Sequence, residues 1–376
     1  MVRRVLIARG GSISPASGLG RAHEDLVRGL ANGVITGFAL KDVIQHNIGG
    51  IAPLRLWRRW KGHPAKVARS VKDVDILHIT DQEHAHLVPK DCKKPVSVTV
   101  HDLFHLDPTT VDTPEGTVEI GETSPGMIRR SDLEKLLAGI ARANLLICDS
   151  KTTEEHAKRL FPQAKTITVP LGLDMDSRNP NKNPQNFPAQ FSSDTLNLLF
   201  IGSEEPRKRL SFAIDVLAGL PSDIRSQIVL HKVGAESDSR EVRKMSEKAN
   251  SVGVDLNPLG RLLETDLIGL EQHAEALLFP SVAEGFGYPP LEAMAAGCPV
   301  LMSDLGSHNE LAVPGTPLDA FDKQAWIDAI IELHAIWSKR ETSLRLPDEV
   351  GIARAAEFNS EVFYKRMSQA WSSMFD

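Results

Sequence analysis

Short apolar, β-branched runs alternate with amphipathic segments along most of the chain. The segments between the runs include predicted helices over 20–31 and 131–143, the second with Ser131 as N-cap and Glu134 at capping-box spacing. This alternation is typical of β-α-β crossovers and a parallel sheet. The runs in the first half that predict buried strands are RRVLIA (3–8), VITGFAL (34–40), DILHIT (75–80), VSVTV (96–100), NLLICD (144–149) and TITV (166–169).

The same pattern of strands and helices restarts after residues 173–194. These residues are rich in Pro, Asn and Ser and lack an apolar period, so we expect them to form a linker. We predict an α/β fold with two doubly wound parallel-sheet domains, 1–172 and 195–355, and a last amphipathic helix (356–376) that joins the first domain. Open sheets of this kind bind ligands at the carboxyl ends of their strands. The second set of strands is TLNLLFIG (195–202), SQIVLHKVG (226–234), VDLNPLG (254–260), AEALLFPS (274–281) and CPVLMSD (298–304).

Composition narrows the class of protein. The 376 residues include 49 acidic and 43 basic side chains, a net charge of −6, which argues against a general nucleic-acid binder. Three scattered cysteines have no metal or redox spacing, so we expect small buried side chains in a reducing compartment. The apolar run at the N-terminus is too short for a signal peptide, and no stretch is long enough to cross a bilayer. These features predict a soluble cytoplasmic protein.

The stretch PSVAEGFGYPPLEAMAAGCPV (280–300) contains the most closely spaced candidate ligand-binding residues in the chain. Pro289 and Pro290 suit the first turn of a helix, and Gly285 and Gly287 let the backbone approach a ligand before it. The amides of a first helical turn attract an anion such as a phosphate. A glutamate at 292 alone could simply complement the helix dipole, so this motif needs support from elsewhere in the chain.

That support comes from FIGSEEPRKRL (200–210), which follows the first strand of the same domain. Arg207, Lys208 and Arg209 should lie at the carboxyl end of that strand, facing the same cleft as the glycine corner. Cations at a helix N-terminus oppose the helix dipole, and an anionic ligand would explain their presence. Arg as a bidentate fork and Lys as a point charge suit a diphosphate.

EGFGYPPLEAMAAGCPV, with its two glutamates eight residues apart, resembles the signature of the retaining glycosyltransferases of family 4, which have the GT-B fold of two facing Rossmann-like domains. Further similar segments are SGLGRAHEDLVRGL (17–30), TVHDLFHLDP (99–108), NLLICDSKTTEEHAKRLF (144–161), VPLGLD (169–174) and EPRK (205–208).

The resemblance implies a site for a nucleotide-sugar donor. Its predicted catalytic residues are His101 and Glu284, beside the donor sugar, and Arg207 and Lys208, on the diphosphate. A glutamate in the first turn of the helix would bind the ribose, and the glycines of the first loop would approach the donor phosphates or the acceptor. The predicted donor-binding residues are Gly18, Gly20, Ser203, Phe286, Gly287 and Glu292.

The implied chemistry is transfer of a hexose to an acceptor hydroxyl on a glycan, glycolipid or small molecule, with retention. Positive groups aimed at the leaving diphosphate would stabilise its charge, so we expect no cofactor and no metal. Two Asp-x-Asp pairs, Asp73/Asp75 and Asp174/Asp176, border a strand and the linker and are interpreted as structural. The similarity to EPRK-containing relatives favours GDP-mannose, with a UDP-sugar next.

Several alternatives stay open. An epimerase of the same fold, or a non-catalytic nucleotide-sugar-binding subunit, would use a similar site. The basic, aromatic segment 54–61, with Trp57 and Trp60, suits a membrane surface, a protein contact or plain domain surface. The irregular segment 106–127 is predicted to be an acceptor lid or disordered. The nucleotide base, the acceptor and the oligomeric state are not fixed by the sequence.

Overall fold

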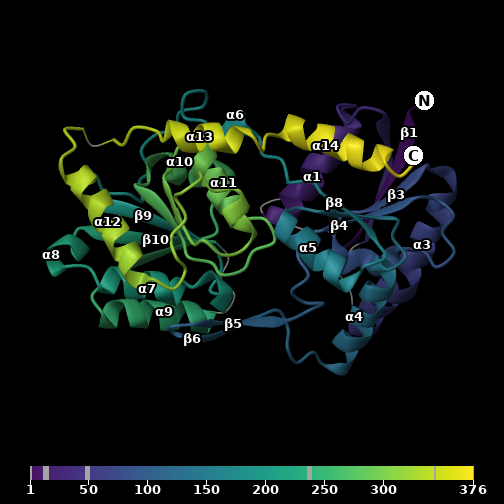
Figure 1. Ribbon diagram of the computed structural model, residues 1–376, viewed down its shortest axis with the longest axis horizontal. Coiled ribbons are helices and arrows are strands. Elements are labelled where there is room, and N and C mark those ends of the chain that lie inside the picture. The colour runs from purple at the N-terminus through teal and green to yellow at the C-terminus, as the bar shows by residue number, and fades with distance from the viewer. Residues whose placement is uncertain (1, 12–16, 47–50, 235–238, 343, 376) are drawn as a thin grey trace. The chain divides into compact units, whose positions relative to one another are not determined.

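Two compact units make up the chain in the computed structural model, and each holds one parallel sheet with helices packed on it (Figure 1). The structure describes residues 2–11, 17–46, 51–234, 239–342 and 344–375. Unit 1 is Met1–Thr109, Gly121–Gly172 and Phe358–Asp376, and unit 2 is Thr110–Ile120 and Leu173–Glu357.

Unit 1 contains a six-stranded parallel sheet in the order β2-β1-β3-β4-β7-β8. Its strands are β1 (Arg3–Gly11), β2 (Phe38–His46), β3 (Ile76–Ile79), β4 (Val96–Val100), β7 (Leu145–Cys148) and β8 (Lys165–Thr168). Its helices are α1 (Gly18–Ala31), α2 (Ala52–Trp57), the π-helical turn η1 (Arg58–Gly62), α3 (His63–Ser70), the 3-10 turns η2 (Val71–Asp73) and η3 (Gln82–Leu87), α4 (Met127–Ile140), α5 (Lys151–Leu160) and α14 (Ser360–Ser372).

The last helix, α14, is part of unit 1 and lies beside α1 (Figure 1). Its buried face includes Trp371, whose indole N–H donates to Ser97 Oγ on β4 over 3.0 Å. Nearer its start, the Tyr364 hydroxyl donates to Asp25 Oδ1 over 2.8 Å. A buried indole or phenol needs such a partner, so these bonds fix α14 on the sheet.

Unit 2 contains a five-stranded parallel sheet in the order β11-β10-β9-β12-β13. Its strands are β9 (Leu196–Ile201), β10 (Ile228–Val233), β11 (Asp255–Gly260), β12 (Ala276–Phe279) and β13 (Val300–Met302). Its helices are α6 (Met175–Arg178), the 3-10 turn η4 (Pro206–Lys208), α7 (Leu210–Ala218), α8 (Ser222–Arg225), α9 (Ser239–Ser251), α10 (Glu264–His273), α11 (Tyr288–Ala295), the 3-10 turn η5 (Ser307–Glu310), α12 (Lys323–Ser338) and α13 (Glu349–Ala356).

The segment predicted to be an irregular lid forms a two-stranded sheet instead. Strands β5 (Thr109–Thr113) and β6 (Gly116–Ile120) pair with each other. Glu115 at their tip pairs with Arg209 over 2.7 Å, and both residues belong to unit 2. The prediction of disorder over 106–127 was wrong. The β-branched residues on either side of the Pro-Glu-Gly turn favour extended backbone, so they form two short paired strands.

Two local predictions in unit 1 also need correction. Strand β2 begins at Phe38, four residues after the predicted start, because Gly37 has a φ of +85° and turns the chain there. Helix α4 begins at Met127 with Gly126 as N-cap, so Ser131 lies inside the helix, where its hydroxyl accepts from Lys135 Nζ over 2.6 Å. The capping-box spacing was therefore coincidental.

Residues 173–194 lie within unit 2. Phe191 belongs to a buried core cluster, and Gln185 donates its backbone N–H to Gln272 Oε1 over 2.8 Å. The short helix α6 places Arg178 deep in the same unit, with 1% of its surface exposed. Pro-rich composition thus accompanies an irregular but packed segment here.

Candidate functional site

The strand order of unit 2 reverses between β9 and β12. Successive strands run outward from β9 through β10 to β11, and on the other side from β12 to β13. At such a switch point the loops that follow the two central strands part and leave a crevice for ligands. Those loops are 202–209 after β9 and 280–287 after β12, the two segments that the sequence singled out.

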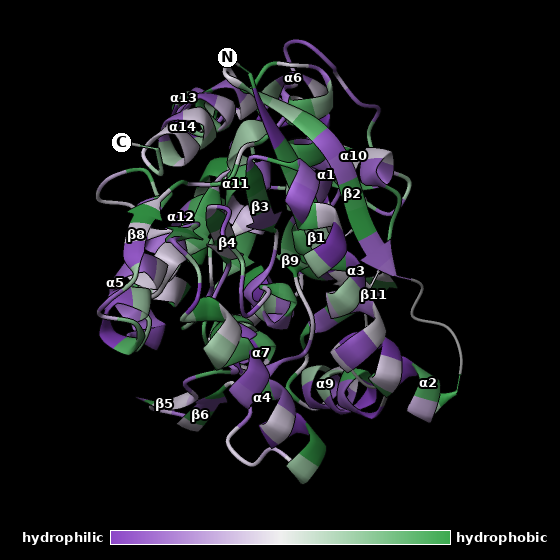
Figure 2. Ribbon diagram, turned by 90° about the vertical axis from the view of Figure 1, so that its right-hand side faces the viewer, coloured by the Kyte–Doolittle hydropathy of each residue, from purple (hydrophilic) through white to green (hydrophobic). Residues whose placement is uncertain are grey.

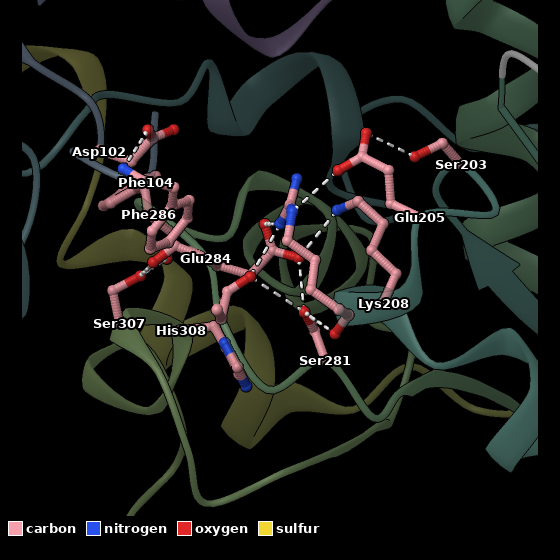
Figure 3. Close-up of polar contacts among 12 residues, drawn as sticks. Asp102, Phe104, Ser203, Glu205, Lys208, Ser281, Glu284, Phe286, Ser307 and His308 are labelled. Carbon is pink, nitrogen blue, oxygen red and sulfur yellow. Dashed lines mark hydrogen bonds and ion pairs between the residues drawn. The ribbon is translucent and has the colours of Figure 1, made fainter. Parts of the chain in front are cut away.

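Glu284, Lys208 and Arg207 come together in this crevice (Figure 3). Lys208 Nζ lies 2.8 Å from Glu284 Oε1, and Arg207 Nη1 lies 2.9 Å from Glu284 Oε2. Ser281 Oγ donates to Glu284 Oε1 over 2.8 Å. The two loops are also joined directly, because the Val282 N–H donates to the Arg207 carbonyl over 2.9 Å. Three predicted catalytic residues therefore form one hydrogen-bonded cluster.

The electrostatics of this cluster hold Glu284 ionised. Burial of the carboxyl opposes ionisation, but the charges of Lys208 and Arg207 and the hydrogen bond from Lys208 outweigh it and lower the pKa of Glu284 to about 2. Only 11% of the Glu284 side chain is exposed, with 13% of Lys208 and 20% of Arg207. The cluster thus presents two partly exposed cations around one permanently charged carboxylate.

The corner before α11 is built around a backbone that only glycine accommodates. Gly287, the N-cap of α11, has a φ of +110°, and a Cβ there would lie 2.7 Å from His308 Cβ. His308 is fully buried, accepts or donates a bond at Nε2 with Ser303 Oγ over 2.9 Å, and has its pKa lowered by burial to about 4. A neutral imidazole therefore packs against this corner.

The first turn of α11 offers fewer amide donors than an ordinary helix start. Pro289 and Pro290, which lie in that turn as predicted, have no N–H. Anion binding at this corner therefore depends more on Lys208, Arg207 and the loop amides than on the helix itself. Ser307 Oγ braces the loop by donating to the Glu284 carbonyl over 2.6 Å.

Two predicted donor-binding residues lie around the same loops. Ser203 Oγ donates to Glu205 Oε1 over 3.0 Å, and Glu205 Oε2 in turn accepts from Arg207 Nε over 2.9 Å (Figure 3). Phe286 is buried and packs edge-on against Tyr288, with 5.4 Å between the ring centroids. Their contacts with a donor remain predictions.

Glu292 lies apart from this cluster, in a second ionic group inside unit 2. It is 1% exposed, and its Oε1 lies 3.2 Å from Arg178 Nη2. Arg178 Nη1 also binds Glu271 Oε2 over 2.5 Å, and Nη2 pairs with Glu264. Burial disfavours the Arg178 charge, but the three carboxylates outweigh it and raise the pKa of Arg178. The predicted ribose contact of Glu292 stays a prediction, and the structure adds the arginine that orients it.

Arg209 does not join the Lys208 and Arg207 pair. It occupies the left-handed region with φ of +56°, and its guanidinium donates to the Ala320 carbonyl over 2.6 Å and to Glu115 Oε2 over 2.7 Å. It also lies 3.9 Å from the centroid of the Phe212 ring. The expectation that three successive cations face one crevice was wrong at this position.

The predicted catalytic residue of unit 1, His101, is enclosed by its own unit. Its Nδ1 lies 2.5 Å from Asp149 Oδ2, and its Nε2 lies 3.0 Å from the Thr80 carbonyl. A carbonyl and a carboxylate only accept, so both ring nitrogens carry protons. Burial lowers the pKa of His101, but Asp149 and the Thr80 carbonyl together raise it to about 9. Contact of this imidazolium with a donor sugar stays a prediction.

The first glycine loop enters the start of α1. Ser17 is the N-cap, and its side chain accepts from the Gly20 N–H over 3.1 Å. Gly18 is half-buried and Gly20 is buried. Their predicted approach to donor phosphates or acceptor is not tested by these contacts.

The two Asp-x-Asp pairs serve local structure. Asp75 accepts from the Arg4 N–H over 2.8 Å, and Asp174 caps α6 by accepting from the Asp176 N–H over 3.2 Å. Within the described part of the chain, no group of three His, Cys, Asp or Glu side chains is placed to hold a metal ion. Of the three cysteines predicted to be buried, Cys148 and Cys298 are, whereas Cys92 is only partly buried. Burial raises the pKa of the Cys298 thiol to about 12.

Sequence reasoning missed three residues that shape these sites. Asp149 directly follows a buried strand, so its place at a carboxyl end was a usable signal. Ser281 lies just beyond the end of β12 at Phe279, three residues before Glu284. Arg178 gave no signal, because its segment had been interpreted as a linker.

Residues 181–343 match the family described as glycosyl transferases group 1. This chain carries a group 1 glycosyltransferase domain. The matched range contains the Glu284, Lys208 and Arg207 cluster, the glycine corner and Glu292, so the resemblance noted from the sequence is confirmed over unit 2.

Curated relatives of this glycosyltransferase domain include O-antigen enzymes. The serotype-specific mannosyltransferase WbdA of Escherichia coli is 29% identical over 43% of this chain and 20% of its own length. The O-antigen chain mannosyltransferase B of Escherichia coli is 32% identical over 43% of this chain and 42% of its own length. The chain thus spans less than half the length of these relatives.

Solved structures match over nearly the whole chain at low identity. Sucrose-phosphate synthase from Thermosynechococcus elongatus superposes with a TM-score of 0.75 at 18% identity, covering 99% of both chains. The Anabaena protein HepE in complex with UDP gives 0.69 at 17% identity, covering 98% of this chain and 99% of that one. The GT-B fold class predicted from the sequence is thereby confirmed. Among the described helices, none has the length and apolar character to span a bilayer.

Proposed function

We propose that this protein is a retaining glycosyltransferase that moves a hexose from a nucleoside diphosphate sugar to an acceptor hydroxyl without a metal. The observation that carries the proposal is the cluster of Lys208, Arg207 and Glu284 at the switch point of unit 2. It lies inside the matched glycosyltransferase domain, where the crevice of an open sheet holds its ligand.

The cluster suits the charge that develops during transfer. Cleavage at the anomeric carbon leaves negative charge on the nucleoside diphosphate, and Lys208 and Arg207 are held partly exposed to receive it. Glu284, which stays ionised, orients both cations and is placed to contact the donor sugar. We expect the leaving phosphate to take the acceptor proton, and we assign no side chain as nucleophile.

The identity of the donor rests on relatives. Two similar Escherichia coli proteins are named mannosyltransferases, which favours mannose and, with it, a GDP-sugar. The HepE neighbour was solved with UDP, which makes a UDP-sugar the next candidate. The acceptor is proposed to be a glycan, glycolipid or small molecule.

Thermal unfolding with a panel of nucleotides tests the proposal. GDP, UDP, ADP, dTDP and CMP are added without metal to the wild type and to an Arg207→Ala/Lys208→Ala variant. A bound nucleotide at ~100 times its Kd should add about 2.7 kcal/mol to stability. One diphosphate should stabilise the wild type and not the variant. The exposed Lys244→Ala on α9 is the matched control and should respond like the wild type.

Turnover is then measured with the nucleotide sugar of the stabilising base. Transfer to an added acceptor would support the proposal, whereas epimerised free donor would identify an epimerase. If no nucleotide stabilises the wild type, even with magnesium, the transferase proposal is contradicted.

A further inference from the structure

The β5-β6 hairpin belongs to a different unit from the sequence around it. Residues 110–120 are part of unit 2, although the segments on either side of them, Met1–Thr109 and Gly121–Gly172, are part of unit 1. Within unit 2, strand β6 packs against η4, the turn that carries Arg207 and Lys208. The hairpin is therefore placed to act on the two predicted catalytic cations of unit 2.

Arg209, which directly follows this turn, has an unusual backbone. Among the described residues it alone combines a positive φ with a side chain, at φ +56° and ψ +42°. That region is sterically disfavoured for such a residue, and it persists only where the surrounding structure enforces it. The Arg209 N–H donates to the Pro206 carbonyl over 3.1 Å, and its carbonyl accepts from the Ala213 N–H over 3.1 Å. Arg209 is thus the joint between the turn and helix α7.

Contacts of the Arg209 side chain enforce this backbone. Nη1 donates to the Ala320 carbonyl over 2.6 Å, and Nη2 donates to Glu115 Oε2 over 2.7 Å. The guanidinium also lies 3.9 Å from the centroid of the Phe212 ring. Among the described residues, Glu115 is the one carboxylate that pairs with Arg209, which is 4% exposed. A buried guanidinium needs such a partner, and the hairpin supplies it.

Helix α7 is a fixed base for the joint. It is mostly hydrophobic (Figure 2), and most of its side chains are buried in the core of unit 2. A change at Arg209 would therefore move η4 rather than α7. The other tether of η4 is the hydrogen bond from the Val282 N–H to the Arg207 carbonyl. Loss of the Arg209 tether would leave Arg207 and Lys208 held on one side only.

We propose that Glu115 is a positioning residue for the donor diphosphate. By pairing with Arg209 it fixes the turn 206–208 in the direction that presents Arg207 and Lys208 to the phosphates. Glu115 acts through Arg209 and makes no contact with the donor. The inference rests on the proposed function, because it requires that Arg207 and Lys208 bind a diphosphate.

The test is a calorimetric titration of the full chain with GDP, UDP, ADP and dTDP. The diphosphate that binds the wild type most tightly and its matching nucleoside are then titrated into Glu115→Ala. The Kd of the diphosphate should rise about tenfold, the size of effect expected for one lost hydrogen bond between charged groups. The Kd of the nucleoside should not change, because it has no phosphate for Arg207 and Lys208 to hold. A general loss of structure would weaken both ligands.

Asp112→Asn is the matched control. Asp112 is an exposed acidic residue of the same hairpin, and it accepts a bond from Thr117 within the hairpin instead of from Arg209. This variant should leave both Kd values unchanged.

Arg209→Gly supplies a background without the guanidinium, in which a positive φ costs little. Adding Glu115→Ala to it should have no further effect, since two residues that act through one contact are not additive. Only 35% of the Glu115 side chain is exposed, but it lies at a hairpin tip, so its own variant decides the question even if Arg209→Gly fails to fold.

Three results would overturn the inference alone. They are an unchanged diphosphate Kd in Glu115→Ala, an equal rise for diphosphate and nucleoside, and a further loss on adding Glu115→Ala to Arg209→Gly. A wild type that binds none of the four diphosphates would instead contradict the proposed function, and the inference with it.

Discussion

Two arginines of this protein are almost equally buried but differ in how many carboxylates they contact. Arg178 of unit 2 is 1% exposed and contacts three carboxylates, Glu264, Glu271 and Glu292. Arg9 of unit 1 is 2% exposed, and among the described residues its guanidinium has one ion pair, to Asp81 over a long 3.4 Å. The carboxylates raise the pKa of Arg178, whereas burial lowers the pKa of Arg9 despite Asp81.

The two arginines differ in how completely the fold compensates their buried charge. A buried ion pair needs good geometry and several hydrogen bonds to repay its desolvation, and Arg178 has them. Arg9 lacks them, because two of its guanidinium nitrogens have no hydrogen-bond partner among the described residues. Lys208 and Arg207 are intermediate, since they are paired with Glu284 yet remain partly exposed.

The largest expected loss of stability follows from replacing Arg178 in unit 2. Arg178→Met should reduce the free energy of unfolding by about 3–5 kcal/mol, because Glu271 and Glu292 would lose their buried arginine partner. Chemical denaturation measures this. Adding Glu271→Gln to the variant should recover part of the loss, as coupled neighbours do. A loss below about 1 kcal/mol would remove the contrast with Arg9.

An acid titration of stability tests whether the ion pairs of Glu284 outweigh the cost of burying its charge. Its pKa falls from 4.5 to about 2 on folding, so its contribution is present above pH 4.5 and is lost as the pH falls toward 2. The wild type should lose about 3 kcal/mol more than Glu284→Gln across that window. Stability curves of the two proteins at several pH values measure the difference. Glu241→Gln, on α9 with 47% of its side chain exposed, should behave like the wild type.

His101 offers a paired buried cation inside unit 1. Its pKa rises from 6.5 to about 9 on folding, so its contribution is complete below pH 6.5 and is lost as the pH rises through 9. Relative to His101→Gln, the wild type should lose roughly 1–2 kcal/mol over this range, less than the full shift because burial also raises the pKa of Asp149. Thermal unfolding between pH 6 and 9.5 measures it, and parallel curves would contradict the ionic pair.

Arg9→Met should have the smallest effect. Its guanidinium makes so few bonds that an apolar side chain of similar length should change stability by no more than about 1 kcal/mol in either direction. The same denaturation experiment that measures Arg178→Met gives the comparison. A loss as large as that of Arg178→Met would mean that Arg9 is a structural residue, and the contrast between the two arginines would fail.

Much of the candidate site in unit 2 was predictable because it consists of short loops after buried strands. The strands around 196–201 and 276–279 are continuous apolar runs, and parallel strands end at one edge. Lys208 and Glu284 were therefore expected at the same edge of the sheet, and they meet because β9 and β12 are neighbours in it. The same argument was wrong for Arg209, which has a positive φ and contacts Ala320 and Glu115 instead.

The apolar pattern determined the α/β class, the positions of the sheet strands to within a few residues, and the two loops that carry the candidate chemistry. Tertiary structure decided the partners: Asp149 for His101, Arg178 for Glu292, and none within bonding distance for two nitrogens of Arg9 among the described residues. Periodicity records whether a side chain is buried, which is a local property of the sequence. Which charge meets which across tens or hundreds of residues depends on strand order and backbone direction, and only the folded chain specifies these.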